Sequence, residues 1–402
     1  MNILFLTLAY PEGEDASNLY IDLMKDLRSK GNSVYVVTAC ERRNDKETSY
    51  VIQQGINVLR VKTGNIQKTN LIEKGISTIL IETQFMKAIR KFMPSVKFDL
   101  VIYSTPPITF SKVIKMIKDR DGAKSYLLLK DIFPQNAVDM GMMKEGGLLH
   151  KLFRNKEEKL YKNSDYIGCM SEANKKYVIN HNNFINPSIV EVCPNSISPK
   201  EIQKVNDIDK KLLKEKLGIP CDSLLIIYGG NLGKPQGIDF LIDIARSNKE
   251  NNKVFFMVVG NGTEYSSLKE FVDIEKPKNF ILKEYLAKKE YEELVKISDV
   301  GLILLDKRFT IPNFPSRLLS YMEYSLPVIA ATDAYTDIKE CLEYGNFGMW
   351  CESGDLDSFN KIINKFIEDS DLLEKMSINS RKYLEEKYTV NISSRIILKH
   401  FI

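Results

Sequence analysis

The stretch Ser223–Gly237, SLLIIYGGNLGKPQG, carries the pattern that decides the fold: an apolar run, a glycine-rich turn and the start of a helix. Because glycine adopts backbone conformations that other residues avoid, Gly230 and Gly233 let main-chain N–H groups approach a bound group closely. We predict a helix beginning near Gln236, whose free N–H groups would bind an anion such as a diphosphate. A tight turn that binds nothing is the alternative, since a glycine cluster alone is weak evidence.

Strand and helix patterns alternate on both sides of this stretch. Apolar runs such as Asn2–Leu8 and Ser33–Ala39 are typical of strands buried on both faces of a parallel sheet, and helical periodicity separates them. This rhythm predicts an α/β protein with two doubly wound, Rossmann-like domains. The Pro/Asn/Ser-rich segment Cys193–Glu201 is typical of a linker. We therefore predict domains at 1–197 and 198–384, with a C-terminal helix of about 385–402 packing back on the first domain.

Composition narrows the class of protein. The chain has 402 residues, 44% hydrophobic and 27% charged, which is more than one hydrophobic core usually serves. Six cysteines are scattered without a C-x-x-C pair and there are three histidines, which argues against a disulfide framework and a multi-histidine metal centre. The N-terminus lacks a basic start, and no charge-free apolar run reaches the roughly 20 residues of a membrane span. We expect a cytoplasmic protein without a metal.

Positive charge is concentrated in the first half. The net charge of +4 divides into +7 for residues 1–197 and −3 for the rest, and residues 62–124 hold twelve Lys/Arg against five Asp/Glu. Part of this excess lies on an amphipathic helix that ends at Pro94. Such a helix either lies on an anionic membrane surface or simply covers its domain with a solvated face.

Two segments of the first half have the character of ligand-binding loops. YSTPPITF, Tyr103–Phe110, and LLLKDIFPQNAVDMG, Leu127–Gly141, each leave the end of a predicted strand, where open α/β sheets bind ligands. The second segment delivers Lys130 and Asp131. A carboxylate in this position can act as a general base or orient a hydroxyl group, although a helix-capping or turn aspartate is the alternative.

The segment FPSRLLSYMEYSLPVIAA, Phe314–Ala331, supplies a second pointer to a phosphate. Pro315 and Ser316 are start signals for a short helix, which places Arg317 in its first turn. A cation at a helix N-terminus is unfavourable unless an anion also lies there. The alternative interpretation is that Arg317 is exposed to solvent, where a cation at a helix N-terminus costs little free energy.

These motifs, in this order, resemble the family 4 retaining glycosyltransferases with the GT-B fold, in which two Rossmann-like domains face each other across a cleft. The similarity covers nearly the whole chain. It is greatest to the bacterial branch that builds O-antigen and capsule repeat units, typified by N-acetylfucosaminyl transferases. The most specific pieces are KDIFPQNAVDMG, YGGNLGKPQG and FPSRLLSYMEYSLPVIAA.

The resemblance implies roles for each domain. The C-terminal domain would bind a nucleotide-sugar, with UDP favoured, and the N-terminal domain a polyprenyl-diphosphate-linked glycan at the cytoplasmic face of an anionic membrane. Transfer would retain the anomeric configuration and need no metal or cofactor. Asp131, Lys130 and Arg317 would be catalytic. The implied donor contacts are Gly230, Asn231, Gly233, Lys234, Gln236, Gly260, Tyr285, Leu286, Pro315, Ser316, Ser320 and Glu323, and the implied acceptor contacts are Ser17, Asn18, Ser104, Thr105 and Pro106.

The chain also departs from the family pattern. Ser320 stands where the family usually has a glutamate that holds the ribose, and Glu323 lies one turn further on; Asn231 and Gln236 replace an Arg and a Lys found in many relatives. Two alternatives therefore stay open: a non-catalytic nucleotide-sugar-binding or assembly protein, and a nucleotide-sugar epimerase of the same fold. A nucleic-acid-binding protein is disfavoured, because the positive charge comes without interleaved aromatic residues.

Overall fold

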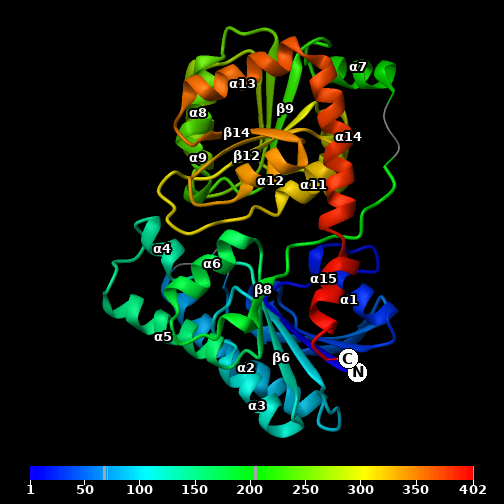
Figure 1. Ribbon diagram of the computed structural model, residues 1–402, viewed down its shortest axis with the longest axis vertical. Helices are drawn as coiled ribbons and strands as arrows, with labels where there is room; N and C mark the ends of the chain where they lie inside the picture. The colour runs from blue at the N-terminus through cyan, green and yellow to red at the C-terminus, as the bar shows by residue number, and fades with distance from the viewer. Residues whose placement is uncertain (67–68, 70, 203–205, 402) are drawn as a thin grey trace. The chain divides into compact units, whose positions relative to one another are not determined.

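The computed structural model describes residues 1–66, 69, 71–202 and 206–401. The chain forms two compact units, a first unit of Met1–Ser198 with Thr389–Ile402 and a second unit of Pro199–Tyr388 (Figure 1). The chain returns to the first unit at Thr389 rather than near residue 385. The reason is that α14 (Ser370–Lys387) stays packed in the second unit, where Arg381 Nη1 donates a hydrogen bond to the Glu323 carbonyl at 3.0 Å.

The first unit is built on an eight-stranded sheet in the order β3-β4-β2-β1-β5-β6-β7-β8. Its strands are β1 (Asn2–Thr7), β2 (Ser33–Glu41), β3 (Ser49–Gln53), β4 (Ile56–Thr63), β5 (Leu100–Ser104), β6 (Lys124–Leu129), β7 (Tyr166–Cys169) and β8 (Val190–Val192). All pairs are parallel except the β3–β4 hairpin. The two-residue turn of this hairpin, Gln54 and Gly55, has positive φ at both positions, which matches the twist of the flanking strands.

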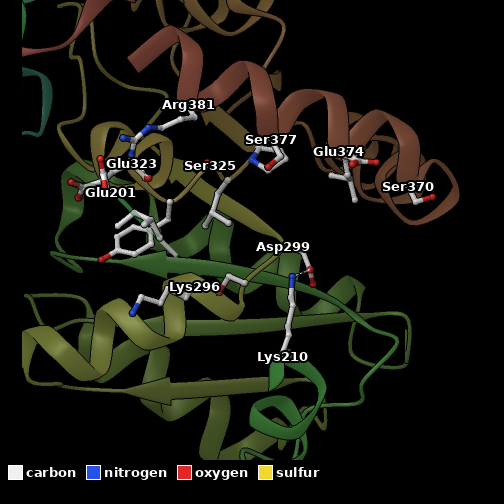
Figure 2. A pocket seen from close by; sticks show the side chains of 16 residues that line it. Glu201, Lys210, Lys296, Asp299, Glu323, Ser325, Ser370, Glu374, Ser377 and Arg381 are labelled. Atoms are coloured by element: carbon white, nitrogen blue, oxygen red, sulfur yellow. Dashed lines mark hydrogen bonds and ion pairs between the residues drawn. The ribbon is translucent and has the colours of Figure 1, made fainter. Parts of the chain in front are cut away.

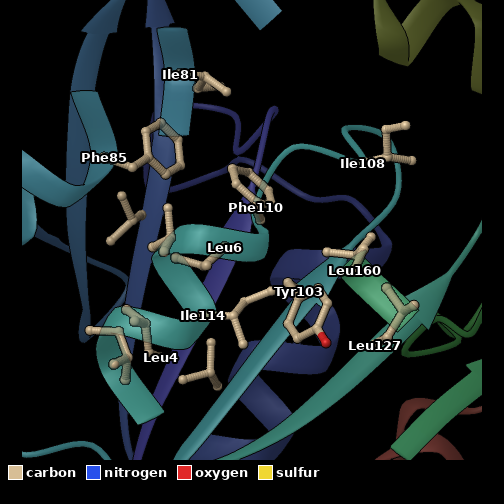
Figure 3. Close-up of a cluster of buried hydrophobic side chains, with 14 of the residues drawn as sticks. Leu4, Leu6, Ile81, Phe85, Tyr103, Ile108, Phe110, Ile114, Leu127 and Leu160 are labelled. Carbon is tan, nitrogen blue, oxygen red and sulfur yellow. The ribbon is translucent and has the colours of Figure 1, made fainter. Parts of the chain in front are cut away.

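Helices cover both faces of this sheet. They are α1 (Leu19–Ser29), α2 (Leu71–Phe92), α3 (Ser111–Asp121), α4 (Gln135–Asp139), α5 (Leu148–Lys162), α6 (Glu172–His181) and α15 (Val390–Leu398). Side chains of α2, α3, α5 and α6 pack on one face, around residues such as Phe85, Phe110 and Leu160 (Figure 3). Those of α1 and α15 pack on the other face. Burial on both faces explains why the strands are continuous apolar runs.

The second unit has a six-stranded parallel sheet in the order β11-β10-β9-β12-β13-β14. Its strands are β9 (Leu224–Gly229), β10 (Val254–Val259), β11 (Phe280–Lys283), β12 (Val300–Leu304), β13 (Val328–Thr332) and β14 (Gly348–Glu352). Its helices, besides α14, are α7 (Asp207–Lys216), α8 (Ile238–Ser247), α9 (Tyr265–Glu275), α10 (Lys288–Ile297), α11 (Arg317–Glu323), α12 (Ile338–Gly345) and α13 (Leu356–Glu368). The prediction of two Rossmann-like, doubly wound domains is confirmed.

The helix predicted to begin near Gln236 is α8, which begins at Ile238. Residues Lys234–Gln236 form a short 3-10 turn, and Gly237 follows in the left-handed region with φ of 59°. The left-handed residue separates the turn from α8, because an α-helix cannot continue through it. Among the described residues, no helix is long and apolar enough to cross a membrane. Lys68, part of the predicted basic region 62–124, lies outside the described residues.

Candidate functional site

The glycine-rich turn lies at the carboxyl edge of the second unit's sheet, meaning the edge at which its parallel strands end. Gly230 N–H donates to the Val259 carbonyl at 2.9 Å, and Gly260 N–H donates to the Lys283 carbonyl at 2.9 Å. A Cβ atom on Gly260 would lie 1.9 Å from the Gly230 carbonyl oxygen. These two loops therefore pack backbone against backbone, which only glycine permits. Gly230 also has φ of 132°, a conformation essentially restricted to glycine.

Arg317 lies against this turn. Its guanidinium carbon is 4.3 Å from the ring centroid of Tyr228, and a Cβ on Gly230 would be 3.6 Å from Nη2 of Arg317. The Nη1 atom is buried without a hydrogen-bond partner, and the side chain forms no ion pair in the part of the chain that the structure describes. Arg317 is half-buried, and a partly buried cation without a counter-ion favours binding of an anion.

The tyrosines around Arg317 do not supply the missing negative charge. Burial raises the pKa of Tyr291 to about 12 and raises that of Tyr321 well above its ordinary value. Tyr321 Oη also accepts from Gly229 N–H at 3.3 Å, and a Cβ on Gly229 would lie 2.0 Å from Tyr291 Oη. Both hydroxyl groups are thus neutral and pack against Gly229 of the turn. They do not compensate the positive charge of Arg317.

Polar side chains of the turn lie close together. Asn231 Nδ2 donates to Gln236 Oε1 at 3.0 Å. Lys234 is exposed and forms no ion pair among the described residues. The first turn of α8 carries Asp239, whose carboxylate opposes the attraction of the helix terminus for an anion. Arg317 and Lys234, rather than the helix terminus, therefore provide the positive charge of this edge.

The remaining predicted donor residues fall into two groups by position. Tyr285 and Leu286 follow β11 at the same carboxyl edge, and the Tyr285 side chain is 83% exposed. Pro315 and Ser316 precede α11, where the Ser316 side chain is exposed and makes no capping hydrogen bond. Ser320 is half-buried in the middle of α11.

Glu323 does not join this group, contrary to the interpretation that it could replace the missing ribose glutamate. Its Oε1 accepts a hydrogen bond from Lys200 N–H at 3.0 Å. It lines a cavity of about 750 Å³ together with Lys210 and Asp299, which precedes β12 (Figure 2). Residues that precede parallel strands lie at the amino edge of the sheet, opposite the glycine turn. Ser320 and Glu323 both belong to α11, and Glu323 alone of the two lines this cavity.

At the carboxyl edge of the first unit's sheet, Lys130 and Asp131 are held by hydrogen bonds. Lys130 Nζ donates to the Cys193 carbonyl at 3.2 Å, and burial lowers its pKa. Asn136 Nδ2 lies 2.7 Å from Oδ1 and 2.9 Å from Oδ2 of Asp131. The Thr105 hydroxyl accepts from the N–H groups of both residues, at 2.9 and 3.2 Å. This network fixes the direction of the Asp131 carboxylate.

Three of the predicted acceptor residues have structural roles instead of a free polar group. Asn18 caps α1, because its side chain accepts from Tyr20 N–H at 3.1 Å and Ile21 N–H at 2.8 Å. Ser104 is buried at the end of β5. Thr105 is buried in the network described above. Ser17 and Asn18 are half-buried and Pro106 is exposed.

Sequence reasoning missed Asn136, Tyr228 and Tyr291. Asn136 follows Asp131 within the singled-out segment KDIFPQNAVDMG, so its spacing was a usable signal. Tyr228 is the residue before the glycine pair and reads as an ordinary apolar strand residue. Tyr291 comes from α10, and nothing in its local sequence indicates that it packs under Gly229.

Comparison with known proteins agrees with this geometry. Residues 209–383 match the family model of glycosyl transferases group 1. The probable glycosyltransferase WbjE of Pseudomonas aeruginosa is 23% identical over 356 residues, 86% of this chain and 84% of WbjE. WcaI of Escherichia coli, named as a candidate colanic acid biosynthesis glycosyl transferase, is 22% identical over 312 residues, 76% of this chain and 73% of WcaI.

Solved structures share the fold. HepE of Anabaena, in a crystal structure with UDP, superimposes with a TM-score of 0.70 at 16% identity, covering 100% of this chain and 99% of HepE. The two-unit architecture is accordingly that of GT-B glycosyltransferases. The family match spans the segment that contains the glycine turn and Arg317, and together these matches support a group 1 glycosyltransferase.

Proposed function

We propose that this protein is a retaining glycosyltransferase that moves a sugar from a nucleotide-sugar, with UDP as the favoured nucleotide, to a lipid-linked glycan in the synthesis of a bacterial surface polysaccharide. The observation that carries the proposal is the uncompensated guanidinium of Arg317 beside the glycine turn, within the segment that matches group 1 glycosyl transferases. The names of WbjE and WcaI support the polysaccharide context.

In this proposal the second unit binds the donor. The diphosphate would contact Arg317, Lys234 and the N–H groups of the glycine turn, and the exposed ring of Tyr285 would stack on the base. Positive charge placed where the leaving diphosphate gains negative charge stabilises the transition state, typically by a factor of about 100 to 1000 per donor group. Ser320 leaves the ribose without the usual carboxylate, so affinity would depend more heavily on the diphosphate.

The first unit would bind the acceptor. Asp131, oriented by Asn136, would contact a reacting hydroxyl, and Lys130 would support this loop through its bond to the Cys193 carbonyl. Charge for the leaving group would come from Arg317 and Lys234, so the proposal requires no resident metal. The sugar could be a hexose or an N-acetylhexosamine, with an N-acetylfucosaminyl group as the specific candidate. The protein would act at the cytoplasmic face of the membrane that holds the acceptor.

The test is to incubate the protein with a panel of UDP- and GDP-sugars, with and without a polyprenyl-diphosphate-linked sugar, and to measure nucleotide release and the product formed. We expect UDP release that depends on the acceptor and a product with the donor's anomeric configuration. Conversion of the nucleotide-sugar to its epimer without an acceptor would identify an epimerase. Tight UDP binding without turnover of any donor would identify a non-catalytic binding protein.

A further inference from the structure

The start of α5 and the loop before it expose an unusual set of apolar side chains. Leu148 is 89% exposed, Met142 64%, Leu149 62% and Leu152 44%. We call these four residues the apolar tip. Isolated exposed leucines are common, but a contiguous apolar group on a surface marks a binding site for a protein or a membrane.

The backbone holds the apolar tip in place. Met142 N–H donates to the Ala137 carbonyl at 2.9 Å, and Gly146 N–H donates to His150 Nδ1 at 3.2 Å. The helix then starts at once, with Lys151 N–H bonded to the Gly147 carbonyl at 2.9 Å. Exposure of these side chains is therefore a property of a regular helix end and a hydrogen-bonded loop.

Basic residues border the apolar tip. Residues 141–162 contain six Lys/Arg and three Glu, and the first turn of α5 contains no acidic residue. Lys144, Lys151 and Lys159 are exposed and form no ion pair among the described residues. One of the three glutamates, Glu157, is buried and paired with Arg154. The surface thus combines apolar side chains with uncompensated positive charge, as interfacial helices do.

Helix α2 also exposes apolar side chains. Ile76, Ile79 and Leu80 near its start are all exposed. Glu82 of α2 forms an ion pair with Lys156 of α5 at 3.8 Å, and α3 packs against both helices. Helix α2 follows β4 and α5 follows β6 and α4, so both helices start on the side where these strands end.

The basic region 62–124, which includes α2, holds both paired and unpaired charges. Lys118 lies 2.7 Å from Asp165, Arg120 lies 2.6 Å from Asp121 and Lys115 lies 3.0 Å from Asp119. Other basic side chains of the region form no ion pair among the described residues, namely Lys87, Arg90, Lys91, Lys97, Lys112 and Lys124.

We infer that the apolar tip inserts into a bilayer of anionic phospholipid, with Lys144, Lys151 and Lys159 at the level of the headgroups. A membrane, rather than a protein partner, is favoured because Lys144 and Lys151 flank the exposed apolar residues, whereas Glu145 is the one acidic residue between Met142 and Leu152. The inference deepens the proposed function, since it places the membrane contact of an enzyme whose acceptor is lipid-linked. It does not depend on the identity of the donor.

The test is sedimentation of the full-length protein with vesicles of phosphatidylcholine alone and with vesicles that also contain phosphatidylglycerol. We expect binding to the anionic vesicles only, weakened but not abolished by salt. The double variant Leu148→Ser/Leu149→Ser should bind at least about tenfold more weakly, because two aliphatic side chains no longer enter the bilayer. The control is Ile208→Ser/Ile274→Ser, two comparably exposed aliphatic residues of the second unit, which should bind like the wild type.

Equal vesicle binding by the two double variants would overturn the inference. So would a wild-type dimer in light scattering that the Leu148→Ser/Leu149→Ser change dissociates, if no vesicle binding is seen, because the tip would then bind a second copy. UDP titration separates this inference from the proposed function. Both double variants should keep the wild-type UDP affinity and unfolding temperature, and vesicle binding by a protein without nucleotide affinity would contradict only the proposed function.

Discussion

The charged groups at the carboxyl edges of the two sheets differ in their hydrogen-bond partners. At the edge of the first unit's sheet, Lys130 and Asp131 are bonded to the Cys193 carbonyl and to Asn136. At the edge of the second unit's sheet, Arg317 rests on Tyr228 with one buried nitrogen unbonded. Hydrogen bonds hold the side chains of the first edge in fixed directions, although Asn136 Oδ1 has no partner, whereas an uncompensated cation retains its attraction for a ligand. The first edge is thus organised to orient a group, and the second to bind an anion.

The largest effect should come from removing the oriented carboxylate. We expect Asp131→Asn to lower kcat by about 100- to 10,000-fold, the range for loss of an acid–base group, while UDP affinity stays unchanged. Steady-state kinetics and calorimetric titration of UDP measure the two quantities. Asp139→Asn in the same segment is the control, because Asp139 bonds Gln135 in α4. A small effect of Asp131→Asn on kcat would mean that Asp131 only stabilises the turn. The first edge would then not be organised to orient a reacting group.

Asn136→Ala tests whether the network orients the carboxylate. The variant keeps the charge of Asp131 but loses both contacts from the Asn136 amide, at 2.7 and 2.9 Å. We expect kcat to fall by roughly tenfold to a hundredfold, less than for Asp131→Asn, because misplaced groups still react with lower probability. Kinetics of the double variant provide the check, since two changes within one unit should be far from additive. Additive losses would mean that Asn136 acts separately from Asp131.

A smaller effect is expected at the exposed ring of Tyr285. Stacking of a base on an aromatic side chain contributes about 1 to 3 kcal/mol, so Tyr285→Ala should weaken UDP binding by roughly 5- to 150-fold. The affinity for ribose 5-phosphate should be the same in Tyr285→Ala as in the wild type, because this ligand has no base. Tyr344→Ala, a change at a ring of α12 that is 77% exposed, is the matched control. Equal losses for UDP and for ribose 5-phosphate would place the base elsewhere.

The pH dependence of stability tests the burial of Lys130. Burial lowers the pKa of Lys130 below its ordinary value of 10.5. Between the lowered pKa and 10.5 the unfolded chain holds a proton that the folded chain has released, so the free energy of unfolding contributed by this group rises with pH over that interval. Urea unfolding at several pH values should show wild-type stability rising relative to Lys130→Met as the pH approaches 10.5. Parallel pH curves for the two proteins would contradict the lowered pKa.

Much of the fold could be predicted because periodicity is a local property. The buried parallel strands, the alternation of strand and helix and the two units all follow from apolar runs and helical spacing. The β3–β4 hairpin was not predicted, although Gln54 and Gly55 carry a turn signal, because β3 is a five-residue edge strand that is largely exposed and has no buried apolar run.

The site was predicted less completely, for a physical reason. Arg317 stood out because its charge conflicts with its place in a helix, and that conflict can be read from sequence. The partners of Arg317 cannot be read from sequence, since Tyr228 of β9 and Tyr291 of α10 come near it only through long-range packing. Asn18 and Thr105 were assigned to the acceptor because polar residues at strand ends look alike, whether they cap a helix, tie two loops together or bind a ligand.

The most direct measurement is calorimetric titration of UDP into the wild type, Arg317→Ala and Arg308→Ala. Both arginines lie near the carboxyl edge of the second sheet, but Arg308 is paired with Asp306 at 2.7 Å whereas Arg317 is unpaired. The account predicts that Arg317→Ala weakens UDP binding by roughly 30-fold or more, the loss expected for a buried charge contact, with the fold intact. Arg308→Ala should change it by less than about threefold, as for an exposed pair. Unchanged UDP affinity in Arg317→Ala, or an equal loss in both variants, would contradict the central claim.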